Sequence, residues 1–375
     1  MTINTFDDIR PYYDSEINEA MLRIADDPLF DNIARYLYPD GNIEEVKNNL
    51  RKINSTDDFQ VQFMDYAIKK IVELTINKYT AEGFEKLDKN KSYLFVSNHR
   101  DILLDSALLQ IALHENGLKT SEITFGSNLM HPQLAVDIGK SNKMFKVKRS
   151  GTPREFYFNT LELSKYIRYT ILDKDESVWI AQRNGRTKNG NDKTDQGLIK
   201  MFASSANNTD ELLQLNITPV TISYQWETCD IEKVYENFVN LSGKYEKKPG
   251  EDMNSVIKGI TQYKGNVHIN IGDTITRENY ELEGVLGRDI NRIVEIIDND
   301  VHKNYKLWDN NYIAHDLINN KNTYLDVKYN SGDRQKFVEK MNEKISAIET
   351  DDKDTLVNLY LEIYSNPVVN QINRL

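Results

Sequence analysis

The spacing of apolar and polar positions divides the chain into three parts. Over residues 1–85 the apolar residues recur every three or four positions, and glycine is almost absent. This spacing predicts amphipathic helices. It returns over residues 281–375, where asparagine-rich connectors separate the helical stretches. We therefore predict a helical N-terminal region, a helical C-terminal region, and a different architecture for residues 86–280 between them.

Six short apolar runs in the middle part predict β-strands. Helical patterns such as Phe156–Leu172 separate most of these runs. The alternation of strands and helices predicts an α/β core with a mostly parallel sheet that is flanked by helices. The predicted strands are Tyr93–Ser97, Ile123–Gly126, Met144–Lys148, Val178–Ala181, Ile217–Tyr224 and Val267–Ile271.

Side chains with catalytic potential follow the first predicted strand. His99 lies just after the strand, and Asp101 and Asp105 follow at the start of a helical pattern. Such strand ends open into the crevice where α/β proteins bind ligands. A carboxylate that accepts a hydrogen bond from one ring nitrogen of His99 would make this ring a general base. The spacing alone does not choose between Asp101 and Asp105, and a capping segment with incidental polar residues is the structural alternative.

Composition narrows the class of protein. The 375 residues carry a formal net charge of −11, whereas a nucleic-acid-binding protein needs a basic face, so we predict no nucleic-acid partner. Cys229 is the one cysteine and the six histidines are scattered, which predicts no disulfide and no metal site. The N-terminus lacks the layout of a signal peptide, and no apolar run approaches the roughly 18 residues of a spanning helix. We therefore expect a cytoplasmic protein.

Basic side chains gather in one segment of this acidic chain. Residues 140–154 contain six Lys and Arg residues and no Asp or Glu. Fixed cations beside the end of a predicted strand suit a ligand that carries a phosphate. We name Lys146, Lys148 and Arg149 as candidate ligand-binding residues, with a solvated basic face as the alternative.

Three further features of the core are candidates for ligand binding. The loop after Val178–Ala181 contains Gly185 and Arg186. Glycine lets backbone N–H groups approach a ligand, and arginine binds an anion. Asn128 follows another predicted strand and is a candidate for lining the pocket of a ligand. Pro219 marks a strand start or a local irregularity, because proline removes a hydrogen-bond donor from the sheet. A plain loop is the alternative interpretation for both loops.

The order of these features resembles the glycerolipid acyltransferase superfamily, which includes glycerol-3-phosphate and lysophosphatidic acid acyltransferases. A His-x5-Asp motif, a basic block, a Gly–Arg loop and a strand that carries proline follow one another over residues 92–226. The resemblance implies an acyltransferase-like α/β fold, with His99 as general base and Asp105 as its orienting carboxylate. The blocks that bind substrate in this family correspond to Lys146, Lys148, Arg149, Gly185, Arg186 and Pro219.

Two departures from the family pattern concern the acceptor site. Five residues separate His99 from Asp105, one more than in the common form. Asn184 stands where the family has Glu, and Arg186 lies one position before the Arg of the family, where this chain has Thr187. Either Arg186 binds the anion from a shifted loop, or the activity is impaired, or the acceptor differs.

The resemblance implies an O-acyltransferase of phospholipid biosynthesis that needs no cofactor. Its acyl donor would be acyl-CoA or acyl carrier protein, and its acceptor glycerol-3-phosphate or 1-acylglycerol-3-phosphate. It would work as a peripheral protein on the inner membrane face. An amino-acid lipid is the alternative acceptor, because some relatives with the longer motif use other acceptors.

Two other classes compete with an acyltransferase. A lipid-binding protein on a degenerate form of the same fold is favoured by Asn184 and disfavoured by the retained His99 and Asp105. A kinase is suggested by His99-Arg100-Asp101. However, Ser106 stands where a kinase has Asn, and no glycine-rich loop precedes the motif.

Overall fold

A computed structural model describes residues 6–148 and 151–373. The strands are β1 Ile76–Glu82, β2 Leu94–Ser97, β3 Glu122–Gly126, β4 Met144–Val147, β5 Val178–Ala181, β6 Ile217–Tyr224 and β7 Gly265–Ile271. They form one sheet in the order β1-β7-β6-β2-β5-β3-β4. All six predicted strands are present within one or two residues of their predicted ends, so the prediction of an α/β core is confirmed.

The sheet is mixed but mostly parallel. Strands β6, β2, β5, β3 and β4 pair in parallel, and β7 runs antiparallel to β6. Strand β1 then pairs in parallel with β7 at the far edge. The carboxyl ends of the five parallel strands therefore meet at one edge of the sheet. Strand β2 is the central strand of the seven and lies between β6 and β5.

The N-terminal region is helical, as predicted, with one difference. Residues 76–82 form the edge strand β1, which begins directly where helix α5 (Asp65–Thr75) ends. Only Ile76 of this strand is buried, and the other residues are exposed or half-buried. An edge strand with so little buried surface leaves no alternating apolar pattern in the sequence.

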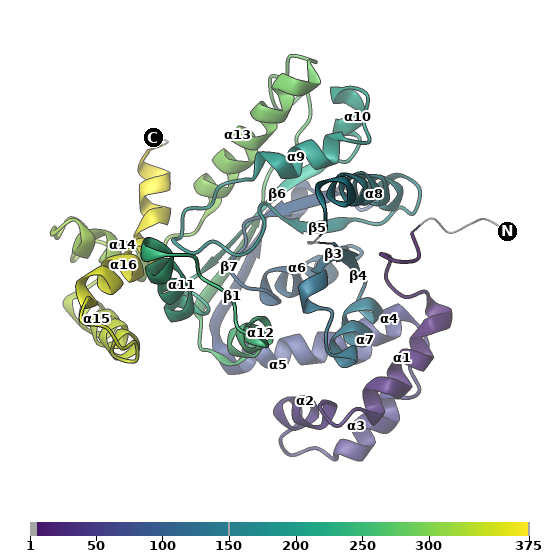
Figure 1. Ribbon diagram of the computed structural model, residues 1–375, viewed down its shortest axis with the longest axis horizontal. Coiled ribbons are helices and arrows are strands. Elements are labelled where there is room, and N and C mark those ends of the chain that lie inside the picture. The colour runs from purple at the N-terminus through teal and green to yellow at the C-terminus, as the bar shows by residue number, and fades with distance from the viewer. Residues whose placement is uncertain (1–5, 149–150, 374–375) are drawn as a thin grey trace.

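Helices surround the sheet and continue beyond it at both ends of the chain (Figure 1). The remaining α-helices are α1 Asp14–Asp26, α2 Phe30–Leu37, α3 Ile43–Leu50, α4 Thr56–Phe59, α6 Leu104–Glu115, α7 Gln133–Ser141, α8 Pro153–Leu172, α9 Gln196–Ala203, α10 Thr209–Leu213, α11 Asp230–Ser242, α12 Glu251–Thr261, α13 Leu286–Asn304, α14 Asp309–Ile318, α15 Ser331–Ser346 and α16 Lys353–Ile372. A π-helix, η1 (Gln60–Met64), precedes α5, and two short 3-10 helices are η2 (Phe84–Lys86) and η3 (Ser127–Leu129).

Each face of the sheet has its own hydrophobic core. One core joins the sheet to α1, α2, α5 and α6, and the other joins it to α8, α9 and α13. Figure 1 shows α8, α9 and α13 together on one side of the sheet. Helix α6 is buried from residue 104 to residue 113 on all its faces, as expected for a helix with apolar residues all round. The start of α6 is therefore firmly held beside the end of β2.

The C-terminal helices form a third core with α11. Helices α14, α15 and α16 pack on one another and on α11, at the left in Figure 1. This core includes a stacked pair, Trp226 and Phe337, whose ring centroids are 5.7 Å apart. Because Trp226 follows β6 closely, the C-terminal helices lie next to the edge where the parallel strands end.

Candidate active site

The loop after β2 is held at the centre of this edge. Residues Leu94–Ser97 pair with β5 on one side and β6 on the other. The Asn98 side chain then accepts a hydrogen bond from Ile222 N at 2.8 Å and donates to Ile222 O at 2.9 Å. The amide thus continues the sheet pairing by one residue, which fixes the backbone just before His99.

His99 and Asp105 form a buried hydrogen-bonded pair. Nδ1 of His99 lies 2.9 Å from Oδ2 of Asp105, and His99 is only 8% exposed. The same Oδ2 accepts the backbone N–H groups of Arg100 at 2.6 Å and Asp101 at 2.9 Å. Tyr224 donates its hydroxyl to Oδ1 at 2.9 Å. Asp105 is thereby held on both oxygens, and it sets Nδ1 as the protonated ring nitrogen.

The second ring nitrogen of His99 is available to a ligand. Within residues 6–148 and 151–373 no hydrogen-bond partner of Nε2 is found. The ring stands edge-on to Trp179, with 6.0 Å between the ring centroids. A neutral imidazole whose Nδ1 donates to a carboxylate carries its lone pair on Nε2. This nitrogen is therefore able to accept a proton from a substrate.

Asp101 has a different role from Asp105. Its Oδ1 accepts the backbone N–H groups of Leu103 at 2.9 Å and Leu104 at 2.8 Å, so it caps the first turn of α6. Its Oδ2 is buried and has no hydrogen-bond partner among the described residues. The structure thus places Asp105, and not Asp101, against His99.

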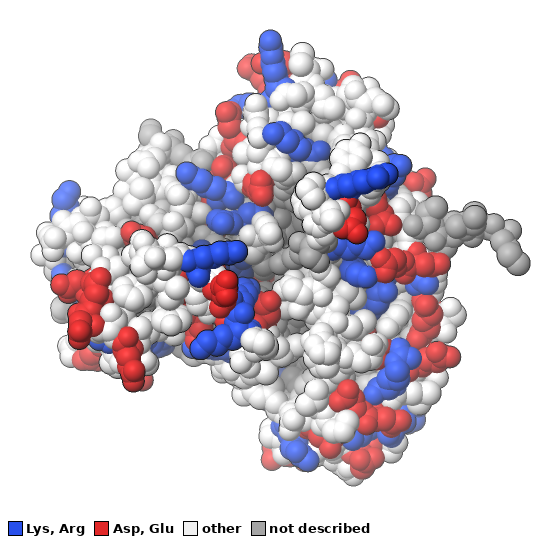
Figure 2. All heavy atoms as spheres, in the orientation of Figure 1, with Lys and Arg blue, Asp and Glu red and all other residues white. Residues whose placement is uncertain are grey.

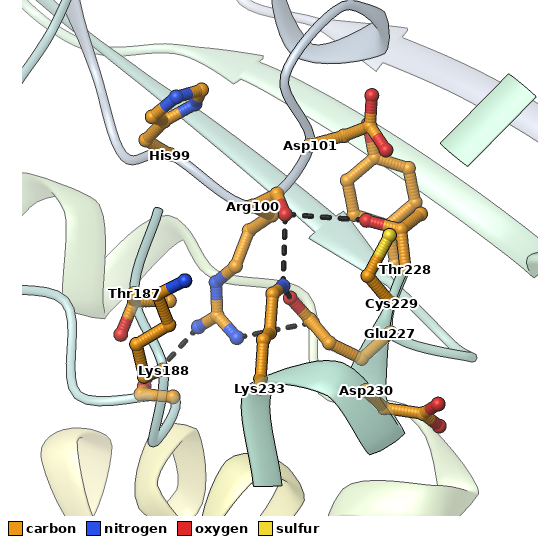
Figure 3. Close-up of polar contacts among 12 residues, drawn as sticks. His99, Arg100, Asp101, Thr187, Lys188, Glu227, Thr228, Cys229, Asp230 and Lys233 are labelled. Atoms are coloured by element: carbon orange, nitrogen blue, oxygen red, sulfur yellow. Dashed lines mark hydrogen bonds and ion pairs between the residues drawn. The ribbon is translucent and has the colours of Figure 1, made fainter. Parts of the chain in front are cut away.

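Arg100 lies on the opposite side of the loop from its neighbours. Figure 3 shows the side chains of His99 and Asp101 on one side of the backbone and that of Arg100 on the other. The Arg100 guanidinium is fully buried and pairs with Asp192 at 2.5 Å and Glu227 at 3.2 Å. Lys233 joins Glu227 at 2.6 Å and donates to the backbone oxygen of Arg100 at 2.8 Å. This buried network fixes the loop after β2 on the side opposite His99 and Asp101.

The Gly–Arg loop packs directly against the His99 backbone. Thr187 N donates to the His99 carbonyl oxygen at 2.9 Å. Gly185 has a φ of +74°, and a Cβ atom there would meet nothing within 4 Å. Arg186 is only 7% exposed, and its Nη1 has no partner among the described residues. Burial alone would lower the pKa of Arg186, but nearby Cys229 and Asp101 raise it, so the guanidinium stays charged.

Helices α11 and α12 close the site on another side. Asn128 donates to Asp252 of α12 at 2.7 Å, and Gly259 of α12 faces Asp101, whose Oδ2 would lie 2.3 Å from a Cβ at this position. Burial acts to raise the pKa of Asp252, but Lys247, Asn128 and the nearby Arg186 hold it below its usual range. Figure 2 shows Lys and Arg side chains beside acidic ones over α11 and α12.

The lysines of the basic segment lie near acids from other parts of the chain. Lys146 pairs with Asp8 at 3.0 Å, and Lys148 pairs with Asp8 at 2.8 Å and with Glu162 at 3.1 Å. Arg149 lies outside the described residues. Much of the positive charge that the sequence suggested for a ligand is therefore compensated within the protein.

Pro219 lies inside β6, opposite Val96 of β2. Its carbonyl oxygen accepts a hydrogen bond from Gly272 N at 2.9 Å. Because the proline nitrogen cannot donate, the strand lacks one bond at this position. Pro219 belongs to the strand next to β2, and so it shapes the sheet beside the site.

Several residues of this site were not found from the sequence. Tyr224 completes the partners of Asp105, and Glu227 and Lys233 complete those of Arg100. All three lie more than a hundred residues away from their partners along the chain. A tyrosine at the end of an apolar strand is the one local signal, and it does not reveal its partner.

No helix in the parts of the chain that the structure describes has the length and the apolar character needed to cross a bilayer.

Comparisons with known proteins give distant structural similarities but no match in sequence. No protein-family model matches the chain, and no curated protein matches it. The fold is similar to the crystal structure of the 1-acyl-sn-glycerophosphate (LPA) acyltransferase PlsC from Thermotoga maritima, with a TM-score of 0.37 and 11% identity. That match covers 74% of this chain and 93% of the other. At this distance the similarity does not carry a function over to this chain.

Proposed function

We propose that this chain is an O-acyltransferase in which His99 is the general base. The observation that carries the proposal is the His99–Asp105 pair at the carboxyl end of β2, with Nδ1 of His99 2.9 Å from Oδ2 of Asp105. Tyr224 and two backbone N–H groups hold this carboxylate in place. A base with a fixed tautomer and an accessible Nε2 is what deprotonation of a hydroxyl requires.

The reaction transfers a fatty acyl group from a thioester, acyl-CoA or acyl carrier protein, to a hydroxyl of the acceptor. Nε2 of His99 takes the hydroxyl proton while the oxygen bonds to the thioester carbonyl carbon. The carbon–sulfur bond then breaks, and the leaving thiolate takes the proton from His99. The Asp105 carboxylate stabilises the imidazolium that exists between these two proton transfers.

The preferred acceptor is glycerol-3-phosphate or 1-acylglycerol-3-phosphate. Arg186 supports this choice, because a buried guanidinium with an unpartnered Nη1 is a ready partner for a phosphate. The open space at Gly185 supports a close approach of ligand to this loop. Lys146 and Lys148 remain candidates, but their acidic neighbours make them weaker phosphate ligands than Arg186.

A second acceptor class is favoured by Asp101. Its unpartnered, buried Oδ2 accepts a hydrogen bond well, and it lies close enough to Arg186 to raise the pKa of that residue. An anion-binding group and a hydrogen-bond acceptor with negative charge in the same site suit an acceptor substrate that carries both charges. An amino-acid lipid with a free hydroxyl has this chemistry.

The experiment is an acyl-transfer assay with purified protein. Labelled acyl-CoA and acyl carrier protein are each offered with glycerol-3-phosphate, its 1-acyl product, and a hydroxylated amino-acid lipid. The variants are His99→Ala, Arg186→Ala, and His114→Ala, a matched control at the exposed C-terminal end of α6. We expect His99→Ala to lose activity by roughly 10²–10⁴-fold, and Arg186→Ala to raise KM for the phosphate acceptors more than it lowers kcat.

Three results would contradict the proposal in different ways. Full activity of His99→Ala would remove the assigned base. Transfer to the amino-acid lipid alone would replace the acceptor but keep the reaction. If wild type acylates no acceptor but still binds lipid, the chain is a binding protein on this fold.

A further inference from the structure

An exposed aromatic tip at the start of α8 is the feature that the site does not use. Phe156, Tyr157 and Phe158 are 59%, 64% and 54% exposed. Every residue from 153 to 158 is exposed, so the first turns of α8 have no face packed on the protein. Three consecutive residues of a helix cover an arc of about 200°. We call residues 153–158 the aromatic tip.

The tip is held in shape although nothing covers it. Thr152 and Glu155 form a capping box, in which Thr152 N donates to Glu155 at 2.7 Å and Glu155 N donates to Thr152 at 3.3 Å. Pro153 begins the helix, where its missing N–H has no cost. The aromatic rings are therefore presented to solvent by a firmly started helix and not by a loose loop.

The tip lies on the same edge of the sheet as His99. Helix α8 starts six residues after the carboxyl end of β4, which runs parallel to β2. Strands β5 and β3 lie between β2 and β4, so the two strand ends are about 15 Å apart at the usual spacing. A surface that the tip enters would therefore lie beside the opening of the candidate site.

The chemistry of the tip favours a lipid surface over other occupants. Rings exposed around most of a helix form a convex knob, which suits a soft surface better than a shaped protein groove. Arg154 stacks over Phe158 with 5.8 Å between its guanidinium carbon and the ring centroid, and it has no ion pair among the described residues. At a bilayer interface the Arg154 cation can pair with lipid phosphates while the aromatic rings contact the acyl chains.

We infer that the aromatic tip inserts into the interface of a phospholipid bilayer and brings the candidate site to its lipid substrates. This inference rests on the proposed function for its purpose, but the insertion itself is separately measurable. Nearby Lys146 and Lys148 are paired with Asp8 and Glu162, so burial of the rings contributes most of the binding. Binding should therefore depend only weakly on salt.

The experiment measures flotation of the full chain with vesicles of phosphatidylcholine that contain a minor share of phosphatidylglycerol. The test variant is Phe156→Ser/Tyr157→Ser/Phe158→Ser. The matched control, Leu22→Ser/Leu29→Ser/Val327→Ser, removes three exposed apolar side chains from other parts of the surface. We expect the test variant to bind vesicles about tenfold more weakly or worse, and the control to bind like wild type.

A second measurement separates this inference from the proposed function. The second measurement is acyl transfer from a short-chain acyl-CoA to glycerol-3-phosphate in the absence of vesicles. We expect the test variant to retain this activity. If wild type binds vesicles through the tip but transfers no acyl group, the proposed function fails and the inference stands. Equal vesicle binding by wild type and test variant overturns the inference. The inference is also overturned if wild type does not bind vesicles. It is overturned as well if the only effect of the test variant is that a wild-type dimer becomes a monomer.

Discussion

Two carboxylates of one short loop have separate tasks because their oxygens meet different donors. Asp105 gathers His99 Nδ1, two backbone N–H groups and the Tyr224 hydroxyl. One oxygen of Asp101 accepts backbone N–H groups at the first turn of α6. A substitution that keeps the shape of each side chain should therefore separate the proposed catalytic role of Asp105 from the capping role of Asp101.

Asp105→Asn should keep the fold and lose most of the activity. The amide oxygen still accepts the backbone N–H groups, but a neutral amide no longer stabilises an imidazolium at His99. We expect kcat to fall by roughly 10²-fold or more, as measured in the acyl-transfer assay, with an unchanged thermal unfolding midpoint to within a few degrees.

Asp101→Asn is the matched comparison at the same scale. Asparagine caps a helix as well as aspartate does, so the free energy of unfolding should change by less than about 0.5 kcal/mol. Activity with phosphate acceptors should stay near that of wild type. A loss of activity restricted to the amino-acid lipid would assign the unpartnered Asp101 Oδ2 to that acceptor, and an equal loss at both positions would contradict the separation of roles.

Sequence alone reaches the candidate residues of this site but not their partners. Only five residues separate His99 from Asp105, so the two show as a motif. By contrast, Tyr224 reaches Asp105 only through the pairing of β6 with β2. Likewise, the excess of lysine in residues 140–154 predicted an anion site. Asp8, which pairs with Lys146 and Lys148, comes from the far N-terminal segment, so sequence distance hid the compensation.

At the scale of elements, Gly259 decides how closely α12 approaches the site. Alanine is the better helix former by up to about 1 kcal/mol, but a Cβ at residue 259 would lie 2.3 Å from Asp101 Oδ2. The steric clash should outweigh the gain in helix propensity, because the Asp101 side chain is fixed by its capping bonds. We expect Gly259→Ala to lower both the free energy of unfolding and the activity.

Gly287→Ala is the control for helix propensity. Residue 287 lies in α13, and a Cβ there would meet nothing within 4 Å. Urea unfolding should show an increase of a few tenths of a kcal/mol for this variant. Stabilisation by both substitutions would mean that α12 does not press on Asp101.

The packing of α13 on the sheet gives a pH-dependent prediction. Burial raises the pKa of Asp300 to about 6, although Asn304 and Lys86 act to lower it. The folded state then binds a proton that the unfolded state releases between about pH 4 and pH 6. The contribution of Asp300 to stability is therefore present at low pH and is lost as the pH rises through about 6.

Asp300→Asn should remove the loss of stability that accompanies deprotonation of Asp300. The difference in unfolding free energy between variant and wild type should be near zero at about pH 4. It should grow to roughly 1–3 kcal/mol in favour of the variant at about pH 7. Urea titrations at several pH values measure this difference, and a variant that is less stable at neutral pH would show that Asp300 is needed in its charged form.

Elements with a strong periodic pattern were predictable, and those that depend on neighbours were not. The buried strand β2 appears as a continuous apolar run because both of its faces are covered. Strand β1 has one buried residue and an exposed edge, so its place in the sheet comes from pairing with β7, a strand almost two hundred residues later.

The C-terminal helices contact the loops of the site, so we expect the whole molecule to unfold as one unit. The backbone N–H of Glu227 donates to the hydroxyl oxygen of Tyr364 in α16 at 3.1 Å, and the side chain of Asn366 donates to Asn189 O at 2.6 Å. Gly190 lies so close to Ile363 O that a Cβ would come within 2.0 Å. The helical C-terminal region is thus joined to the core through the loops after β5 and β6.

Lys344→Met tests this unity, because Lys344 pairs with the fully buried Asp230 at 2.5 Å. The carboxylate would keep its two tyrosine donors and the backbone N–H of Ile231 but lose its only ion pair among the described residues. We expect a loss of about 3 kcal/mol in unfolding free energy. Trp179 reports on the core beside His99, and Trp226 reports on the C-terminal helices. In two variants that each keep only one of these tryptophans, fluorescence should give the same unfolding midpoint. Lys344→Met should lower both midpoints equally. The exposed Lys336→Met is the control and should lower neither midpoint. A lower midpoint at Trp226 alone would mean that the C-terminal helices unfold independently, and then they could not be what holds the loops around His99.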